Sequence, residues 1–141
     1  MSSLDDQEIR DFLLHGTRTA KVAYNASDGR PLVVPIWFVL DGGDLVFNTG
    51  VETAKGRALA RDPRLALSVD LEEPPFAFVQ VQGEAQLSEE PSELLRTATA
   101  IAARYMGSER AEEFGRRNGA PGSMVVRVRP NKVIAEMDMV A

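Results

Sequence analysis

The sequence predicts a mainly β protein, an antiparallel barrel with peripheral helices. Six or seven short segments with strand character follow one another, and most are joined by tight turns rather than by the long helices of βαβ units. The chain has 141 residues, of which 44% are hydrophobic, and this suits one domain with a real core. Because no repeat, linker or low-complexity segment interrupts it, we expect a single domain over residues 1–141.

The first third of the chain is predicted to be a helix followed by a β-meander. Ser3 can cap a helix over residues 3–15, and Gly16 suits its end. Strand character then appears three times, and Asp28-Gly29 and the run DGGD mark the two turns between the segments. The expected strands lie within residues 17–25, 32–40 and 45–49.

The apolar run over residues 32–40 contains two informative residues. Pro35 lacks a backbone N–H, so the strand must lie at a sheet edge, carry a bulge or be interrupted there. Trp37 follows in the same run. It is either a core residue or a wall of a ligand site.

The rest of the chain alternates between helical and strand signals. A short helix is predicted over residues 53–63 and ends at Asp62-Pro63. Ser88 or Ser92 can cap a long helix within 88–107. The other expected elements are strands at 64–71 and 76–87, a helix at 108–118, and two strand-like segments within 123–140 separated by a break at Pro130-Asn131. The predicted apolar stripe of the long helix is Leu94, Leu95, Ala98, Ile101, Ala102 and Tyr105.

Composition excludes several classes of function. The net charge of −5 is unusual for a general nucleic-acid binder, so we expect no nucleic-acid partner. The absence of Cys excludes disulfides and thiolate metal sites, and a single His excludes a His-rich metal site, so we expect no metal. No apolar signal core is present, and no apolar run approaches the roughly 20 residues of a membrane span. We therefore expect a cytoplasmic protein with no membrane partner.

A basic stretch follows the third expected strand. Thr53 stands where a helix would begin, and Lys55 and Arg57 follow it. One interpretation is a solvated helix face. The other is an anion site, because the free N–H groups of a helix N-terminus bind phosphate or carboxylate. Gly56 costs about 1 kcal/mol in a helix relative to Ala, which suggests close approach of a ligand or another chain.

The order of these segments resembles the split-barrel flavin and deazaflavin oxidoreductases, the superfamily of pyridoxamine 5′-phosphate oxidase. The motifs that carry the resemblance are DGRPLVVPIWF, FNTG, TAKGRALARDP, LALSVD and FVQVQGEAQL, and the resemblance covers roughly residues 4–140. It implies a split β-barrel. It also implies a homodimer with the cofactor site at the subunit interface.

The resemblance further implies which residues bind the cofactor. One strand lies beside the ring, the end of the next strand lies near the linking chain, and the basic stretch binds the phosphate. A strand of the partner subunit closes the site. In this sequence the corresponding residues are Val34, Pro35, Ile36 and Trp37 for the ring, Asn48 and Thr49 for the chain, Thr53, Lys55 and Arg57 for the phosphate, and Gln80 and Gln82 for the partner strand.

The sequence departs from pyridoxamine 5′-phosphate oxidase itself. It has Ala54-Lys55 in place of a paired Arg-Lys, and that enzyme's C-terminal Arg and His elements are not evident. The short TAK version looks more like the group that uses coenzyme F420, an 8-hydroxy-5-deazaflavin. The resemblance thus implies an F420H2-dependent reductase that passes a hydride to an unsaturated or conjugated small molecule. The sequence assigns no catalytic residue or proton donor.

Two alternatives remain open at this point. The same fold can bind FMN instead. FMN ends at its phosphate, so Arg57 and Arg61 would then have less negative charge to bind. The protein can also be a non-catalytic binder of a flavin, a deazaflavin or haem. The lack of an evident acid–base pair fits all three, because in hydride transfer the cofactor carries the difficult chemistry.

Overall fold

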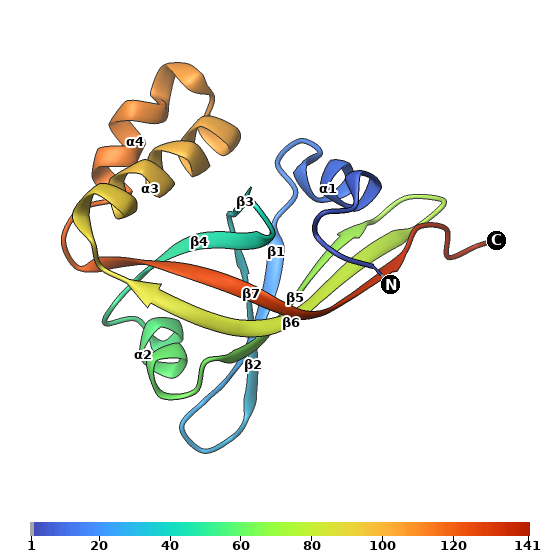
Figure 1. Ribbon diagram of the computed structural model, residues 1–141, viewed down its shortest axis with the longest axis horizontal. Coiled ribbons are helices and arrows are strands. Elements are labelled where there is room, and N and C mark those ends of the chain that lie inside the picture. Colours follow the sequence, from blue (N-terminus) through green and yellow to red (C-terminus); the bar gives the residue numbers. More distant parts are fainter. Residues whose placement is uncertain (1) are drawn as a thin grey trace.

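One seven-stranded antiparallel sheet, in the order β2-β1-β5-β6-β7-β4-β3, forms the body of the protein (Figure 1). The structure, a computed structural model, describes residues 2–141, so Met1 of the expected domain lies outside the described residues. The strands are β1 (Ala20–Asn25), β2 (Pro31–Ile36), β3 (Val39–Asp41), β4 (Asp44–Gly50), β5 (Arg64–Leu71), β6 (Ala77–Ser88) and β7 (Ser123–Glu136).

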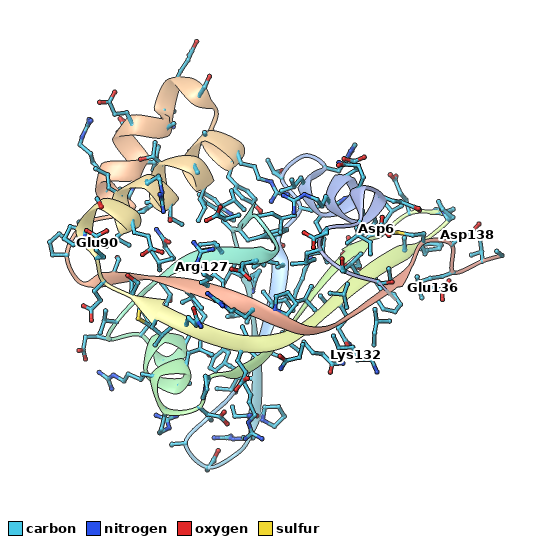
Figure 2. The ribbon with its side chains drawn as sticks, in the orientation of Figure 1. Asp6, Glu90, Arg127, Lys132, Glu136 and Asp138 are labelled. Atoms are coloured by element: carbon cyan, nitrogen blue, oxygen red, sulfur yellow. The ribbon has the colours of Figure 1, made fainter. Side chains whose placement is uncertain are left out.

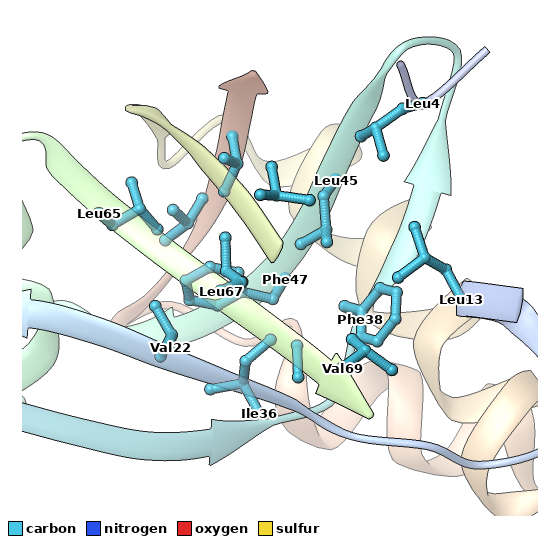
Figure 3. Packing of buried hydrophobic residues seen from close by; sticks show 14 of the residues in the cluster. Leu4, Leu13, Val22, Ile36, Phe38, Leu45, Phe47, Leu65, Leu67 and Val69 are labelled. Carbon is cyan, nitrogen blue, oxygen red and sulfur yellow. The ribbon is translucent and has the colours of Figure 1, made fainter. Parts of the chain in front are cut away.

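The sheet curls around a single main core. Val22 of β1, Leu67 of β5 and Phe47 of β4 pack in one buried cluster, although three strands separate β1 from β4 in the sheet (Figure 3). Strands so far apart share a core only if the sheet bends back on itself. Because β2 and β3 remain as edges, the barrel is open, and the predicted mainly β split barrel is confirmed.

The helices lie at the periphery of the sheet (Figure 1). They are α1 (Gln7–Leu14), α2 (Ala54–Arg61), α3 (Pro91–Met106), the short 3-10 turn η1 (Ser108–Arg110) and α4 (Ala111–Asn118). The expected helix over 108–118 is therefore α-helical only from Ala111 onward. No helix within residues 2–141 has the length and apolar character needed to cross a bilayer.

Two helix caps differ from the prediction (Figure 2). Helix α1 begins after Asp6, whose carboxylate accepts a hydrogen bond from the N–H of Glu8 at 3.0 Å, while Ser3 only closes a turn before it. Helix α3 is capped by Glu90 rather than by Ser88 or Ser92. Because Pro91 fixes the first helical position, the Glu90 carboxylate is placed to accept from the next two backbone N–H groups.

The expected apolar stripe of α3 is wrong at one position. Leu95 is 43% exposed, whereas Leu94, Ala98, Ile101 and Ala102 are buried. Thr97 is buried instead of Leu95. The side of α3 that faces the sheet is thus less apolar than helical periodicity alone predicts.

Two strand predictions also need correction. The run over residues 32–40 is not one strand, because pairing stops after Ile36 and resumes at Val39. Its first part, β2, lies at a sheet edge, as Pro35 requires. The expected break at Pro130-Asn131 is instead a bulge within an unbroken β7, where the register shifts by one residue opposite Gly83.

Candidate functional site

A pocket of about 410 Å³ lies where the β2–β3 junction, the end of β4, α3 and the end of α4 meet. Five of the predicted cofactor-binding residues line it, from two separate segments of the chain. They are Pro35, Ile36, Trp37, Asn48 and Thr49. The fold therefore brings the expected ring-facing strand and the expected strand end together at one hollow.

Trp37 forms an aromatic wall of this pocket. Its ring is 40% exposed, and it stacks on Tyr105 of α3 with centroids 4.9 Å apart and planes 2° from parallel. The Tyr105 hydroxyl accepts from the Phe38 N–H at 3.2 Å and donates to the Arg18 carbonyl at 2.8 Å. Trp37 is thus outside the core, held against a ring that is itself fixed by two backbone hydrogen bonds.

The end of β4 supplies polar groups to the same pocket. The Asn48 side-chain amide donates to the Phe47 carbonyl at 3.2 Å and accepts from the Ala98 N–H at 3.3 Å, which places it against α3. Thr49 is buried, and its hydroxyl lies 3.3 Å from that of Thr53. The strand therefore leads from the pocket directly into the start of α2.

Thr53 caps α2, as the sequence predicts. Its hydroxyl accepts from the Gly56 N–H at 3.0 Å and donates to the Gly50 carbonyl at 2.8 Å, so its proton is already engaged. The backbone N–H groups of Ala54 and Lys55 have no partner within residues 2–141. These two N–H groups are the donors that the first turn of α2 can offer to an anion.

Lys55 and Arg57 differ in their surroundings. Lys55 is half-buried, and burial lowers the pKa of its ammonium because the charged form loses water. Within residues 2–141 no carboxylate pairs with it, whereas Arg57 forms an ion pair with Glu52 at 3.1 Å. Lys55 therefore carries the uncompensated charge at the start of this helix.

The close approach at Gly56 involves this chain's own backbone. A Cβ added at Gly56 would collide with the Gly50 carbonyl oxygen and lie 3.1 Å from that of Val51. Glycine therefore allows α2 to pack against the turn that leads out of β4. This explains its presence in a helix without a ligand.

Six predicted residues are not part of the pocket lining. They are Thr53, Lys55 and Arg57 at the start of α2, and Val34, Gln80 and Gln82. The Val34 side chain packs against the core, while Gln80 and Gln82 lie on the outer face of β6 and bond to each other at 2.7 Å. Gln80 belongs to a cross-strand row that begins at Pro35, three strand spacings or about 14 Å away. Gln80 thus reaches a ring beside Pro35 only from another copy of the chain.

Several residues of the pocket were not predicted from the sequence. Arg117 and Asn118 close it from the last turn of α4, and Ser123 lines it from the start of β7. Gly50, Ala98 and Ile101 complete the lining. No local motif marks Arg117, because only the packing of α4 on α3 brings it to the strand ends.

An open antiparallel barrel, with a pocket at the strand ends and a basic helix start beside it, defines a split-barrel protein that binds a flavin or a related cofactor. The chain belongs to the pyridoxamine 5′-phosphate oxidase family, whose model matches residues 5–136. The resemblance seen in the sequence is thereby confirmed. No curated protein matches the chain.

Solved structures support the same fold. A conserved hypothetical protein from Mycobacterium tuberculosis is 25% identical with a TM-score of 0.82, covering 98% of this chain and 85% of that one. A structure described as an F420 reductase is 25% identical with a TM-score of 0.71, covering 88% and 94%. A haem-binding protein from Mycobacterium smegmatis is 22% identical with a TM-score of 0.71, covering 95% and 54%, and it shows the fold alone.

Proposed function

We propose that this protein is a homodimeric, coenzyme F420-dependent oxidoreductase that reduces an unsaturated or conjugated small molecule. The observation that carries the proposal is the placement of Lys55. This half-buried cation has no carboxylate partner within residues 2–141 and stands in the first turn of α2, five residues after the strand whose end lines a pocket with an aromatic wall. An anion site joined to a site for a planar ring suits a phosphate-bearing flavin-like cofactor.

The residues present fit such a cofactor. Trp37, Pro35 and Ile36 would lie against the ring, with Val34 contributing backbone. Asn48 and Thr49 would orient the linking chain. The ammonium of Lys55 and the two free N–H groups of α2 would bind the phosphate, while Thr53 shapes that turn as its cap.

When bound by these residues, reduced F420 would supply a hydride, which carries two electrons, to one carbon of a double bond conjugated to a carbonyl, and the other carbon would take a proton. No carboxylate, imidazole or phenol belongs to the described lining of the pocket, and we propose water as the proton source. The protein's own contribution is to bind and orient the two molecules.

The choice of F420 over FMN rests on charge beyond the phosphate. F420 extends past its phosphate into a glutamate tail, and Arg61 is an exposed cation in the last turn of α2. Glu52 partly neutralises Arg57, so Arg57 should contribute less to binding of the glutamate tail. The F420 reductase among the similar structures, 25% identical to this chain, supports the same choice.

Parallel fluorescence titrations with F420 and FMN test the proposal. We expect tight binding of F420, weak binding of FMN, and oxidation of F420H2 by at least one conjugated acceptor. Preference for FMN would make the protein an FMN oxidoreductase. Tight binding of either cofactor with no turnover across an acceptor panel would make it a carrier, and binding of neither would direct the titration to haem.

A further inference from the structure

Arg117 of α4 differs from the two neighbouring arginines, Arg110 in η1 and Arg116 in α4. Arg110 pairs with Glu113 at 3.1 Å, and Arg116 pairs with Glu112 at 3.2 Å. Arg117 lines the pocket and has no carboxylate partner within residues 2–141. Its guanidinium lies 5.6 Å from the centroid of the Phe114 ring. Arg117 thus brings an uncompensated positive charge to the pocket.

The pocket around Arg117 suits a planar anion. Trp37, backed by the Tyr105 ring, offers a flat aromatic surface. Asn118 and Ser123 add neutral polar groups beside Arg117, and the described lining contains no acidic residue. In a chain whose net charge is −5, a pocket lined by one cation and no anion selects against a cationic ligand.

The charge on Arg117 comes from a different element than the cluster on α2. In Figure 1, α2 lies on one side of β6 and β7, and the α3–α4 pair lies on the other. Lys55 and the first turn of α2 already account for the cofactor phosphate under the proposed function. Arg117 is therefore available to bind an anion on a different molecule, the acceptor that approaches the cofactor ring beside Trp37.

We propose that Arg117 binds a carboxylate of the electron acceptor, which makes the substrate class a planar, conjugated carboxylic acid. The guanidinium matches a carboxylate with two parallel hydrogen bonds, and the conjugated part of the acceptor lies over the cofactor ring that Trp37 backs. In the apoprotein, where no cofactor covers Trp37, a planar acid lies on the Trp37 ring directly. The assignment of this ligand as the acceptor rests on the proposed function. The binding preference itself concerns the apoprotein and stands without it.

Binding of 4-nitrocinnamate and of its neutral amide to the apoprotein tests the proposal. A nitroaromatic ring quenches tryptophan emission on contact, and Trp37 is the only Trp in the chain, so quenching reports occupancy of this pocket. Because Arg117 is exposed, we expect the carboxylate to bind about two- to fivefold more tightly than the amide, the range for an exposed ion pair. Equal affinity for the two probes would overturn the proposal.

The variants R117M and R116M separate the pocket arginine from its neighbour. R117M should abolish the preference for the carboxylate and leave affinity for the amide within about twofold. R116M removes the same charge from the same helix outside the pocket, so it should keep the preference. A preference that survives in R117M, or that disappears equally in R116M, would contradict a role for Arg117.

Titration of F420 into R117M distinguishes this inference from the proposed function. We expect F420 affinity within about twofold of the wild type. A large loss would show that Arg117 binds the cofactor rather than the acceptor, and would overturn the inference while leaving F420 binding intact as a function. A wild type that prefers the carboxylate but binds no F420 would instead refute the proposed function alone.

Discussion

The rings of Trp37 and Tyr105 lie face to face, with centroids 4.9 Å apart and planes inclined by 2°. Only Trp37 lines the pocket, while Tyr105 supports it from α3. The Tyr105 hydroxyl bridges the Phe38 N–H and the Arg18 carbonyl. The position of the pocket wall therefore depends on a phenol that touches no ligand.

Tyr105→Phe removes this bridge and keeps the stacked ring. It leaves the Phe38 N–H without its partner and the Arg18 carbonyl with only a 3.4 Å bond from Arg104, so the free energy of unfolding should fall by about 1–3 kcal/mol. Trp37 should keep its emission maximum because the phenyl ring still covers it. Urea denaturation measures the loss, and Tyr24→Phe is the control, since Tyr24 is the chain's other tyrosine. Equal losses of stability in Tyr105→Phe and Tyr24→Phe would show that the hydrogen bonds of Tyr105 are not the cause.

Lys55→Met should have opposite effects on cofactor binding and on the stability of the apoprotein. Loss of the ammonium should weaken F420 binding by about 1.5–3 kcal/mol, the range for hydrogen bonds to charged groups. Without ligand the variant should be at least as stable as the wild type, because burial disfavours the charged lysine and lowers its pKa. A large loss of apoprotein stability would contradict this.

The pH dependence of Lys55 follows from the same lowered pKa. Between the folded and the unfolded pKa of this group, the unfolded chain binds more protons. The free energy of unfolding of the wild type should therefore rise with pH through that window, and Lys55→Met should lack this rise. Urea titrations from pH 7 upward measure the difference, with R116M as the control for net charge.

Arg127 links β7 to the β3–β4 turn and to α3 (Figure 2). It contacts Asp41 at 2.8 Å, Asp44 at 3.2 Å and Glu93 at 3.7 Å, and its side chain is 19% exposed. Its hydrogen bond lowers the pKa of Asp41. Arg127→Met should lower the free energy of unfolding by about 1–2 kcal/mol at pH 7, more than an exposed pair contributes.

The loss of stability caused by Arg127→Met should depend on pH. A carboxyl whose folded pKa is lowered contributes stability above its unfolded pKa and loses it as the pH falls through the folded value. The difference in the free energy of unfolding between wild type and variant should therefore become smaller from about pH 4 downward. A gap that stays constant to pH 2 would show that packing, rather than the ion pairs, causes it.

Local chemistry accounts for the parts of the fold that the sequence predicts. Asp28-Gly29 makes the hairpin between β1 and β2 because Gly29 adopts φ 86°. The break after Ile36 was missed because its partners are distant in sequence. The Phe38 carbonyl accepts from Arg104 at 2.7 Å, and the Phe38 N–H donates to Tyr105. No periodicity in residues 32–40 reports a contact with α3.

The candidate site could likewise be predicted only where its residues are close in sequence. We assigned the end of β4 and the start of α2 to one site because that strand leads into that helix. Arg117 was missed because it reaches the pocket only through the packing of α4 on α3, where Gly115 lies directly against Thr99. The roles of Gln80 and Gln82 stay predictions because they require a second chain.

Gly56→Ala tests whether geometry overrides helix propensity. Propensity alone predicts a gain of about 1 kcal/mol. The added Cβ would collide with the Gly50 carbonyl oxygen, so we expect a loss of about 1–3 kcal/mol instead. Ala60→Gly on the exposed side of α2 is the control and should cost about 1 kcal/mol. A stabilised Gly56→Ala variant would show that the turn after β4 shifts freely.

The outer face of the sheet is the surface through which we propose that the two copies of the homodimer meet. Val33, Ala23, Ala66 and Gln82 form one cross-strand row on this face. Val33 is 68% exposed on the edge strand β2, and the two alanines beside it are half-buried. A row of small and apolar side chains on an open face suits contact with a second copy. That contact would also bring Gln80 and Gln82 to the partner's site.

Ala66→Arg places a charge at the centre of this face and should separate the subunits. A desolvated, unpaired guanidinium costs an interface several kcal/mol, enough to give a monomeric mass in light scattering at micromolar concentration. Ala103→Arg adds the same charge at an exposed position on α3 and should stay dimeric. Since the partner's strand β6 closes the cofactor site under this proposal, Ala66→Arg should also weaken F420 binding. A dimeric Ala66→Arg would place the interface elsewhere, and a monomeric wild type that binds F420 tightly would show that one chain forms the whole site.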